Sequence, residues 1–107
     1  MGINHQTVTT FEVKDHVARI TMNRPEAMNS MNPDLRWELS QHWDAVEADD
    51  DIWVVVLTGA GERAFSAGAD LKHRAREREA DGAQRAEWQK MANETTSLTE
   101  RWHFPKP

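Results

Sequence analysis

The chain has 107 residues, 38% of them hydrophobic, which allows one domain or part of one. Its formal net charge of −5 argues against a general attraction to nucleic acid, so an anionic ligand would need a local basic cluster. The absence of cysteine excludes disulfides and zinc–thiolate sites and fits a reducing cytoplasm, and no apolar run is long enough to cross a membrane.

Two short segments rich in β-branched residues stand near the start of the chain. They are Thr7–Val13 and Val17–Asn23, and the turn-like residues Lys14–His16 lie between them. This pattern predicts a β-hairpin. Pro25 then ends the second strand, because proline lacks the amide hydrogen that strand pairing uses.

A well-marked helix start follows the hairpin. Asn32 is suited to the N-cap, Pro33 to the first helical position, and Asp34 to the positive end of the helix dipole. We predict a helix over Pro33–Glu47. Its apolar face recurs at three- and four-residue spacing and consists of Leu35, Leu39, Trp43 and Val46.

The next apolar segment, Ile52–Thr58, shows no alternation, which is typical of a strand that is covered on both faces, parallel and central. A strand and a helix precede it, so a right-handed β-α-β crossover is the natural topology. Farther along, Gly82–Trp102 predicts a second long helix. Its apolar anchors are Trp88, Met91, Leu98 and Trp102. These elements predict the α/β fold class.

Small residues follow the apolar strand. Gly59, Gly61 and Ala64 match G-x-G-x-x-A, the spacing of a dinucleotide-binding loop. The surroundings argue against that function, because Gly68 would lie inside the following helix and no second strand appears over residues 72–85. The basic run over residues 71–78 is most simply a solvated helix face. We therefore expect the functional element to be Phe65–Lys72.

The segment Phe65–Lys72, "FSAGADLK", resembles the first signature of the crotonase superfamily, the enoyl-CoA hydratase/isomerase family. Ile20–Asn32 is similar to that family's first strand and CoA-contacting loop, and Ile52–Lys72 follows at the family's usual distance. The resemblance covers essentially the whole chain. It implies a crotonase-like α/β fold of ββα-type repeats in a spiral, with residues 1–107 as the N-terminal part of that domain.

The resemblance also implies where substrate binds. The Ala69 N–H is expected to be one of two oxyanion-hole amides. If Gly68 makes the turn and Ala69 begins a helix, this amide lies unpaired at the positive helix end, where it stabilises negative charge on a thioester oxygen. The residues implied to lie along CoA are Ala27, Met28, Ala67, Gly68, Ala69, Asp70, Leu71 and Lys72.

Several neighbouring side chains have simpler interpretations. Asp70 is better explained as a helix-cap or structural carboxylate than as a catalytic acid. Arg24 and Lys72 suit either CoA phosphates or ordinary surface positions. Ser66 lacks a histidine or acid at triad spacing and is interpreted as a turn residue, whereas Phe65 is expected in the core. The five histidines form no ligand pattern, so no metal site is expected.

The resemblance implies a CoA thioester as substrate, no permanently bound cofactor, and a homotrimer or dimer of trimers without nucleic-acid or membrane partners. The family's second oxyanion amide and its proton-transferring glutamates have no counterpart in this chain. We therefore expect a substrate-binding half-site, inactive and not stably folded alone. Enoyl-CoA hydratase is the leading chemistry. Isomerase, hydrolase, decarboxylase and dehalogenase chemistry, and a non-catalytic interaction module derived from a crotonase, remain alternatives.

Overall fold

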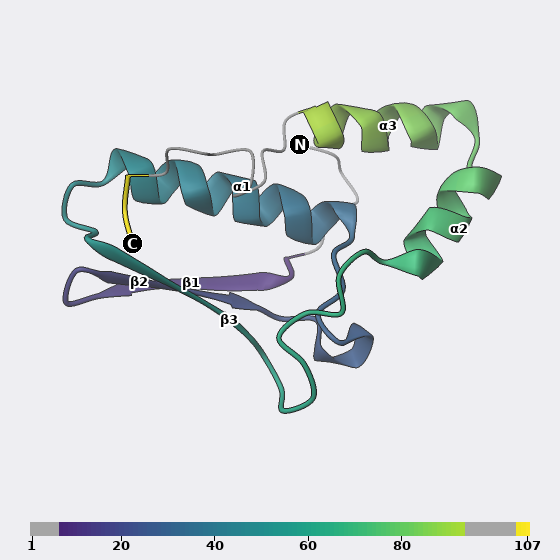
Figure 1. Ribbon diagram of the computed structural model, residues 1–107. Helices are drawn as coiled ribbons and strands as arrows, with labels where there is room; N and C mark the ends of the chain where they lie inside the picture. Colours follow the sequence, from purple (N-terminus) through teal and green to yellow (C-terminus); the bar gives the residue numbers. More distant parts are fainter. Residues whose placement is uncertain (1–6, 94–104) are drawn as a thin grey trace.

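The computed structural model describes residues 7–93 and 105–107. Helix α1 lies along one face of a three-stranded sheet, and α2 lies beyond the end of that sheet (Figure 1). The arrangement confirms the α/β class. In chain order the elements are β1 (Thr9–Lys14), β2 (Val17–Met22), the 3-10 helix η1 (Pro25–Ala27), α1 (Pro33–Ala48), β3 (Val54–Gly59), α2 (Leu71–Glu79) and α3 (Gly82–Asn93).

Strands β1 and β2 form the predicted hairpin. They pair antiparallel, with Thr9 opposite Met22. Asp15 and His16 make the turn with φ values of 50° and 68°. Two left-handed residues in succession match the right-handed twist of the flanking strands, which is why short hairpin turns adopt them. Strand β2 ends before Pro25, as predicted, and that proline begins η1.

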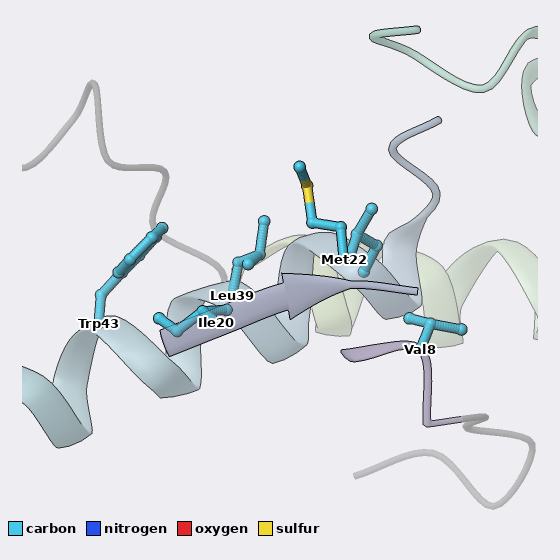
Figure 2. Packing of buried hydrophobic residues seen from close by; sticks show 6 residues of the cluster. Val8, Ile20, Met22, Leu39 and Trp43 are labelled. Atoms are coloured by element: carbon cyan, nitrogen blue, oxygen red, sulfur yellow. The ribbon is translucent and has the colours of Figure 1, made fainter. Parts of the chain in front are cut away.

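Helix α1 begins where the capping residues predict. The Asn32 Oδ1 accepts a hydrogen bond from Leu35 N at 2.9 Å, and Pro33 occupies the first turn. All four residues of the predicted apolar face are buried. Figure 2 shows Leu39 and Trp43 in the packing between the helix and β2. This main core, between α1 and the sheet, consists of Val8, Ile20, Met22, Leu35, Leu39 and Trp43.

Strand β3 pairs parallel with β2, so the β-α-β crossover is confirmed as a parallel connection. Val55 and Leu57 pack against buried residues, but Val54 and Val56 on the opposite face are each 37% exposed. In the described part of the chain β3 is also an edge strand. The prediction of a central strand covered on both faces is therefore wrong here. An apolar run shows that a strand suits burial, but it does not supply the layer that would cover it.

The polar second half contains two described helices. Helix α2 contains residues 71–78, the basic run interpreted as a solvated helix face, and α3 begins at Gly82, as predicted. Met91 is buried and Trp88 is half-buried, which confirms two of the four anchors, and α3 contacts α1. Leu98 and Trp102 lie outside the described residues. None of the helices described is both long and apolar enough to cross a membrane.

A buried polar cluster holds β1 against α1. The Glu38 carboxylate is buried and accepts hydrogen bonds from Val8 N at 2.9 Å and Thr9 Oγ1 at 2.5 Å. His42 Nε2 lies 2.7 Å from the same hydroxyl, and its ring stacks on Phe11 with centroids 4.9 Å apart. Burial lowers the pKa of His42, and the nearby Glu38 charge opposes that shift.

Residues 105–107 lie at the junction of α1 and β3. The Lys106 ammonium donates to the carbonyl oxygens of Val46 at 2.7 Å and Asp49 at 2.6 Å, at the C-terminal end of α1. The Pro107 carbonyl oxygen accepts a hydrogen bond from Val55 N at 2.9 Å. Residues 105–107 therefore contact both the C-terminal end of α1 and the backbone near the start of β3.

Candidate functional site

The candidate site lies where two loops meet. The η1 loop (residues 23–32) follows β2, and the 60–70 loop follows β3. Because β2 and β3 are parallel neighbours, both loops leave the same end of the sheet, and Figure 1 shows them side by side. All the residues predicted to bind CoA belong to these loops or to the first turn of α2.

A short backbone bridge joins the two loops. Met31 N donates to Gly68 O at 2.6 Å, and Asp70 N donates to Met31 O at 3.2 Å. Met31 and Ala69 are thereby paired as an isolated parallel β-bridge. The Met31 side chain packs against the main core, so the bridge is fixed to the helix-and-sheet scaffold.

Among the hydrogen bonds of the described residues, the Ala69 N–H has no acceptor, whereas its neighbours Ala67, Gly68 and Asp70 all donate within the protein. Its direction follows from the peptide unit that it shares with the Gly68 carbonyl. That peptide bond is trans and planar, so its C=O and N–H point in opposite directions. Since Gly68 O faces Met31, the Ala69 N–H points away from Met31 and is available to a ligand.

The local backbone differs from the prediction in one respect. Gly68 makes the expected turn, with φ at 86° in the region that glycine tolerates best. Ala69 does not begin a helix, because α2 starts at Leu71. The pairing of residues 68 and 70 with Met31 keeps Ala69 extended and delays the helix. The amide is unpaired because it lies on the outer edge of the bridge, and not because it opens a helix.

The other predicted binding residues are partly accessible. Ala67, Gly68 and Lys72 are exposed, Ala27 and Ala69 are half-buried, and the carbonyl oxygens of Ala27 and Met28 accept hydrogen bonds from Ser30 and Ala67. Large apolar side chains also face solvent here: Leu71 is 73% exposed and Phe65 is 55% exposed. The prediction of Phe65 as a core residue is therefore wrong in the described structure, since the turn at residues 60–66 directs it outward.

Arg24 and Asp70 form an ion pair between the loops. Arg24 Nη2 lies 3.2 Å from Asp70 Oδ2, and the exposed fractions of the two side chains are 15% and 13%. The other terminal nitrogen, Nη1, donates to Ser30 O at 2.6 Å and Ser30 Oγ at 3.2 Å. Asp70 thus has the structural role predicted for it. Arg24 fits neither of the alternatives considered from sequence, because its charge is directed into the protein.

Asn29 is a site residue that the sequence interpretation missed. It is fully buried, its Nδ2 donates to Ala60 O and Ala64 O at 3.0 Å each, and its Oδ1 accepts from Arg24 N at 2.9 Å. Its φ of 54° is in the left-handed region, where asparagine is several-fold enriched. An asparagine two residues after η1, facing a small-residue loop, was the available signal.

Ser66 and Gly59 complete the loop packing. Ser66 Oγ donates to Asn29 O at 2.8 Å and accepts from Gly68 N at 3.1 Å, which confirms it as a turn residue. A Cβ on Gly59 would lie 2.6 Å from Asn29 Nδ2, so this position requires glycine for close approach. No helix follows Gly61 before Leu71 in this described segment, which removes the geometry that a dinucleotide-binding loop needs. Residues 7–93 and 105–107 contain no group of three or more side chains arranged to hold a metal ion.

Comparison with known proteins gives a consistent result. The family model described as enoyl-CoA hydratase/isomerase matches residues 12–101. The chain is 54% identical over 63 residues to the (E)-benzylidenesuccinyl-CoA hydratase of Thauera aromatica, covering 59% of this chain and 25% of that protein. It thus spans about a quarter of the length of the curated relatives it matches.

Solved structures show the same similarity. The carnitinyl-CoA hydratase of Mycobacterium avium superposes with a TM-score of 0.65 at 37% identity, over 66% of this chain and 27% of that one. The enoyl-CoA hydratase of Bacillus anthracis gives a TM-score of 0.64 at 35% identity, over 79% of this chain and 32% of that one. The described fold is thus a portion of the crotonase fold, as the sequence resemblance implied.

Proposed function

Since the chain belongs to the enoyl-CoA hydratase/isomerase family, we propose that it forms the acyl-CoA-binding half of an enoyl-CoA hydratase-type active site. The observation that carries the proposal is the Ala69 N–H, which has no acceptor among the described residues and is held in a fixed direction by its own peptide unit. A rigid, unpaired amide is suited to an oxygen atom that gains negative charge.

The proposed chemistry is the addition of water to an α,β-unsaturated thioester. The water oxygen bonds to the β-carbon, and the electron pair of the double bond moves through the α-carbon onto the thioester oxygen, which gives an enolate. The water gives up a proton to a carboxylate supplied by polypeptide outside this chain, a carboxylic acid of the same source delivers a proton to the α-carbon, and the carbonyl re-forms. Ala69 N–H donates to the thioester oxygen, most strongly in the charged enolate, and one such donor is typically worth ~10²–10³ in rate.

The rest of the proposed site surrounds this amide. Ala67 and Gly68 are small and exposed, so they allow the thioester to approach, and the exposed Leu71 offers apolar contact. CoA is expected to lie along residues 67–72 and to meet the backbone of Ala27 and Met28. It is a substrate in this proposal, and no permanently bound cofactor is required.

We propose that residues 1–107 are the N-terminal part of a crotonase-like domain. The second oxyanion amide and the proton-transferring carboxylates then come from polypeptide outside this chain. The complete protein is expected to be a cytoplasmic homotrimer or dimer of trimers that acts in fatty acid metabolism. The similarity to longer hydratases of the same family supports the assignment of this chain to one part of a larger domain.

A composite enzyme tests the proposal. In it, residues 7–107 replace the matching segment of the Bacillus anthracis enoyl-CoA hydratase, which the chain resembles at 35% identity. Ala69→Pro removes the amide hydrogen, whereas Ala69→Ser keeps it. No hydrogen bond of the described structure uses that hydrogen, so the proline variant loses no internal donor. We expect Ala69→Pro to lower the turnover of crotonyl-CoA by about 10²-fold or more, with a much smaller effect for Ala69→Ser.

Thermal unfolding of both variants controls for damage by the proline ring. Equal turnover in two equally folded variants would contradict the proposed role of Ala69. Binding of crotonyl-CoA without turnover, in a composite whose other residues are intact, would favour a non-catalytic interaction module instead.

A further inference from the structure

We infer that Arg24 is a positioning residue for the oxyanion amide: its guanidinium braces the Met31–Ala69 bridge and so fixes the direction of the Ala69 N–H. The inference rests on the function proposed above and adds a residue to it. Arg24 lies 46 positions before Asp70 in the chain and acts through the bridge residues, not on the substrate.

The two hydrogen bonds of the bridge, on either side of Ala69, differ in length. Gly68 O and Met31 N are 2.6 Å apart, but Asp70 N and Met31 O are 3.2 Å apart, at the long end of the usual hydrogen-bond range. The peptide unit before Ala69 is therefore firmly held, while the residue after it is held more weakly. Arg24 acts on both sides of the bridge. On the weaker side its ion pair is with the Asp70 side chain. On the firmer side it donates to Ser30 O, and the peptide unit of that carbonyl carries the Met31 N–H that holds Gly68 O.

The Arg24 guanidinium forms hydrogen bonds with both segments of the bridge. Nη1 contacts Ser30, the residue before Met31, and Nη2 contacts Asp70, the residue after Ala69. A planar guanidinium keeps its two terminal nitrogens at a fixed separation, whereas a lysine ammonium is a single point of charge on a flexible stem. The brace is anchored at its base as well, since Arg24 N donates to Asn29 Oδ1 at 2.9 Å.

Charge gives the brace a second effect. Asp70 directly follows Ala69, whose N–H donates to the enolate oxygen. The negative charge of the Asp70 carboxylate therefore repels the negative charge that develops on that oxygen. The Arg24 guanidinium offsets that carboxylate, and the low exposure of the pair limits screening by water. Removal of Arg24 therefore loosens the amide and exposes the enolate to more of the negative charge of Asp70.

The kinetic test compares four variants of the composite enzyme with crotonyl-CoA as substrate. Arg24→Met should lower kcat by about 10-fold and change KM by less than about twofold, because the amide acts mainly on the charged enolate. Arg24→Lys should recover part of the loss. Adding Asp70→Asn to Arg24→Met should also recover part of it, a result that simple loss of packing would not produce. Arg36→Met, which changes an exposed arginine of α1, is the matched control and should retain full activity.

A second measurement needs no substrate. In the ¹⁵N-labelled composite enzyme, Arg24→Met should shift the Ala69 amide resonance and accelerate its hydrogen exchange, with Arg36→Met leaving both unchanged. If Arg24→Met matches Arg36→Met in kcat while Ala69→Pro still lowers turnover by about 10²-fold or more, the positioning role is wrong and the proposed function stands. If Ala69→Pro has no effect on turnover, the proposed function fails, and the exchange data alone then decide whether Arg24 holds this peptide unit.

The inference would be overturned if every Arg24 variant lost thermal stability together with kcat and Asp70→Asn recovered neither. Arg24 would then be a structural residue only.

Discussion

The helix-and-sheet scaffold and the paired loops are stabilised in different ways. Between α1 and the sheet, fully buried side chains such as Ile20, Met22 and Leu35 exclude water, and burial of apolar area supplies most of the stability. In the loops the buried residues are polar: Asn29 and Ser30 are covered, whereas Met28 and Phe65 face solvent. The scaffold thus depends on the volume and shape of side chains, and the loops depend on the direction of hydrogen bonds.

This difference explains how the site keeps a donor unpaired. In a region stabilised by apolar burial, helices and paired strands satisfy most backbone groups internally, which leaves few for a ligand. The loop region pairs the N–H groups on either side of Ala69 and, in the described structure, leaves that one without an acceptor. Met31 connects the two regions, because its backbone forms the bridge and its side chain packs against the main core.

The largest expected effect is on the scaffold. Leu35 is fully buried between α1 and the sheet, so Leu35→Ala should destabilise the composite enzyme by about 3 kcal/mol through lost burial and a residual cavity. Urea unfolding gives the free-energy change. At urea concentrations where the variant stays folded, kcat should change little, because Leu35 belongs to α1 and to neither loop. A large fall in kcat in the still-folded variant would show that the two regions are not separable.

An intermediate effect is expected at Asn29. Asn29→Ala leaves Ala60 O, Ala64 O and Arg24 N without this partner and should cost about 2 kcal/mol, with a clear loss of turnover. Asn29→Asp is the matched control, since it keeps the Oδ1 acceptor for Arg24 N and replaces only the two amide donors. The free energy of unfolding in urea and the turnover of crotonyl-CoA should both be highest for the wild type and lower for each of the two variants. If both variants kept full activity, the loops would not depend on this side chain.

The smallest effect is a pH dependence of stability. Burial lowers the pKa of His42 in the folded protein, so protonation favours the unfolded state. The contribution of His42 is therefore fully present above its ordinary pKa of 6.5 and is lost as the pH falls through the lower, folded value. Thermal unfolding at a series of pH values should show a decline below about pH 6.5 that is weaker in His42→Gln. A stability that rises on acidification in this window would contradict the assigned sign.

The sequence predicted the scaffold well because its signals are local and periodic. Asn32 and Pro33 marked the start of α1, and the spacing of Leu35, Leu39, Trp43 and Val46 marked its buried face. The hairpin followed from two short β-branched segments around a turn. Burial of β3 on both faces was wrong, because an apolar run does not specify what covers it.

The site was predicted only in part. The motif located Ala69 and the turn at Gly68, but the extended conformation of Ala69 depends on Met31, which no local pattern connects to it. The ion pair of Arg24 with Asp70 joins residues 46 positions apart, and two isolated charges in a sequence do not indicate a pair. Contacts of this kind come from the topology of the parallel strands, which brings both loops to one end of the sheet.

Lys106 has a consequence for the order in which the fold assembles. The last turn of α1 contains no basic residue. The carbonyl oxygens of Val46 and Asp49 at that helix end instead accept hydrogen bonds from the Lys106 ammonium, which lies 60 and 57 positions farther along the chain. A contact of such sequence separation closes a long loop, so it forms late, after local helix and hairpin contacts. The C-terminal end of α1 should therefore fray until this ammonium docks, and the lysine should slow unfolding far more than it speeds folding.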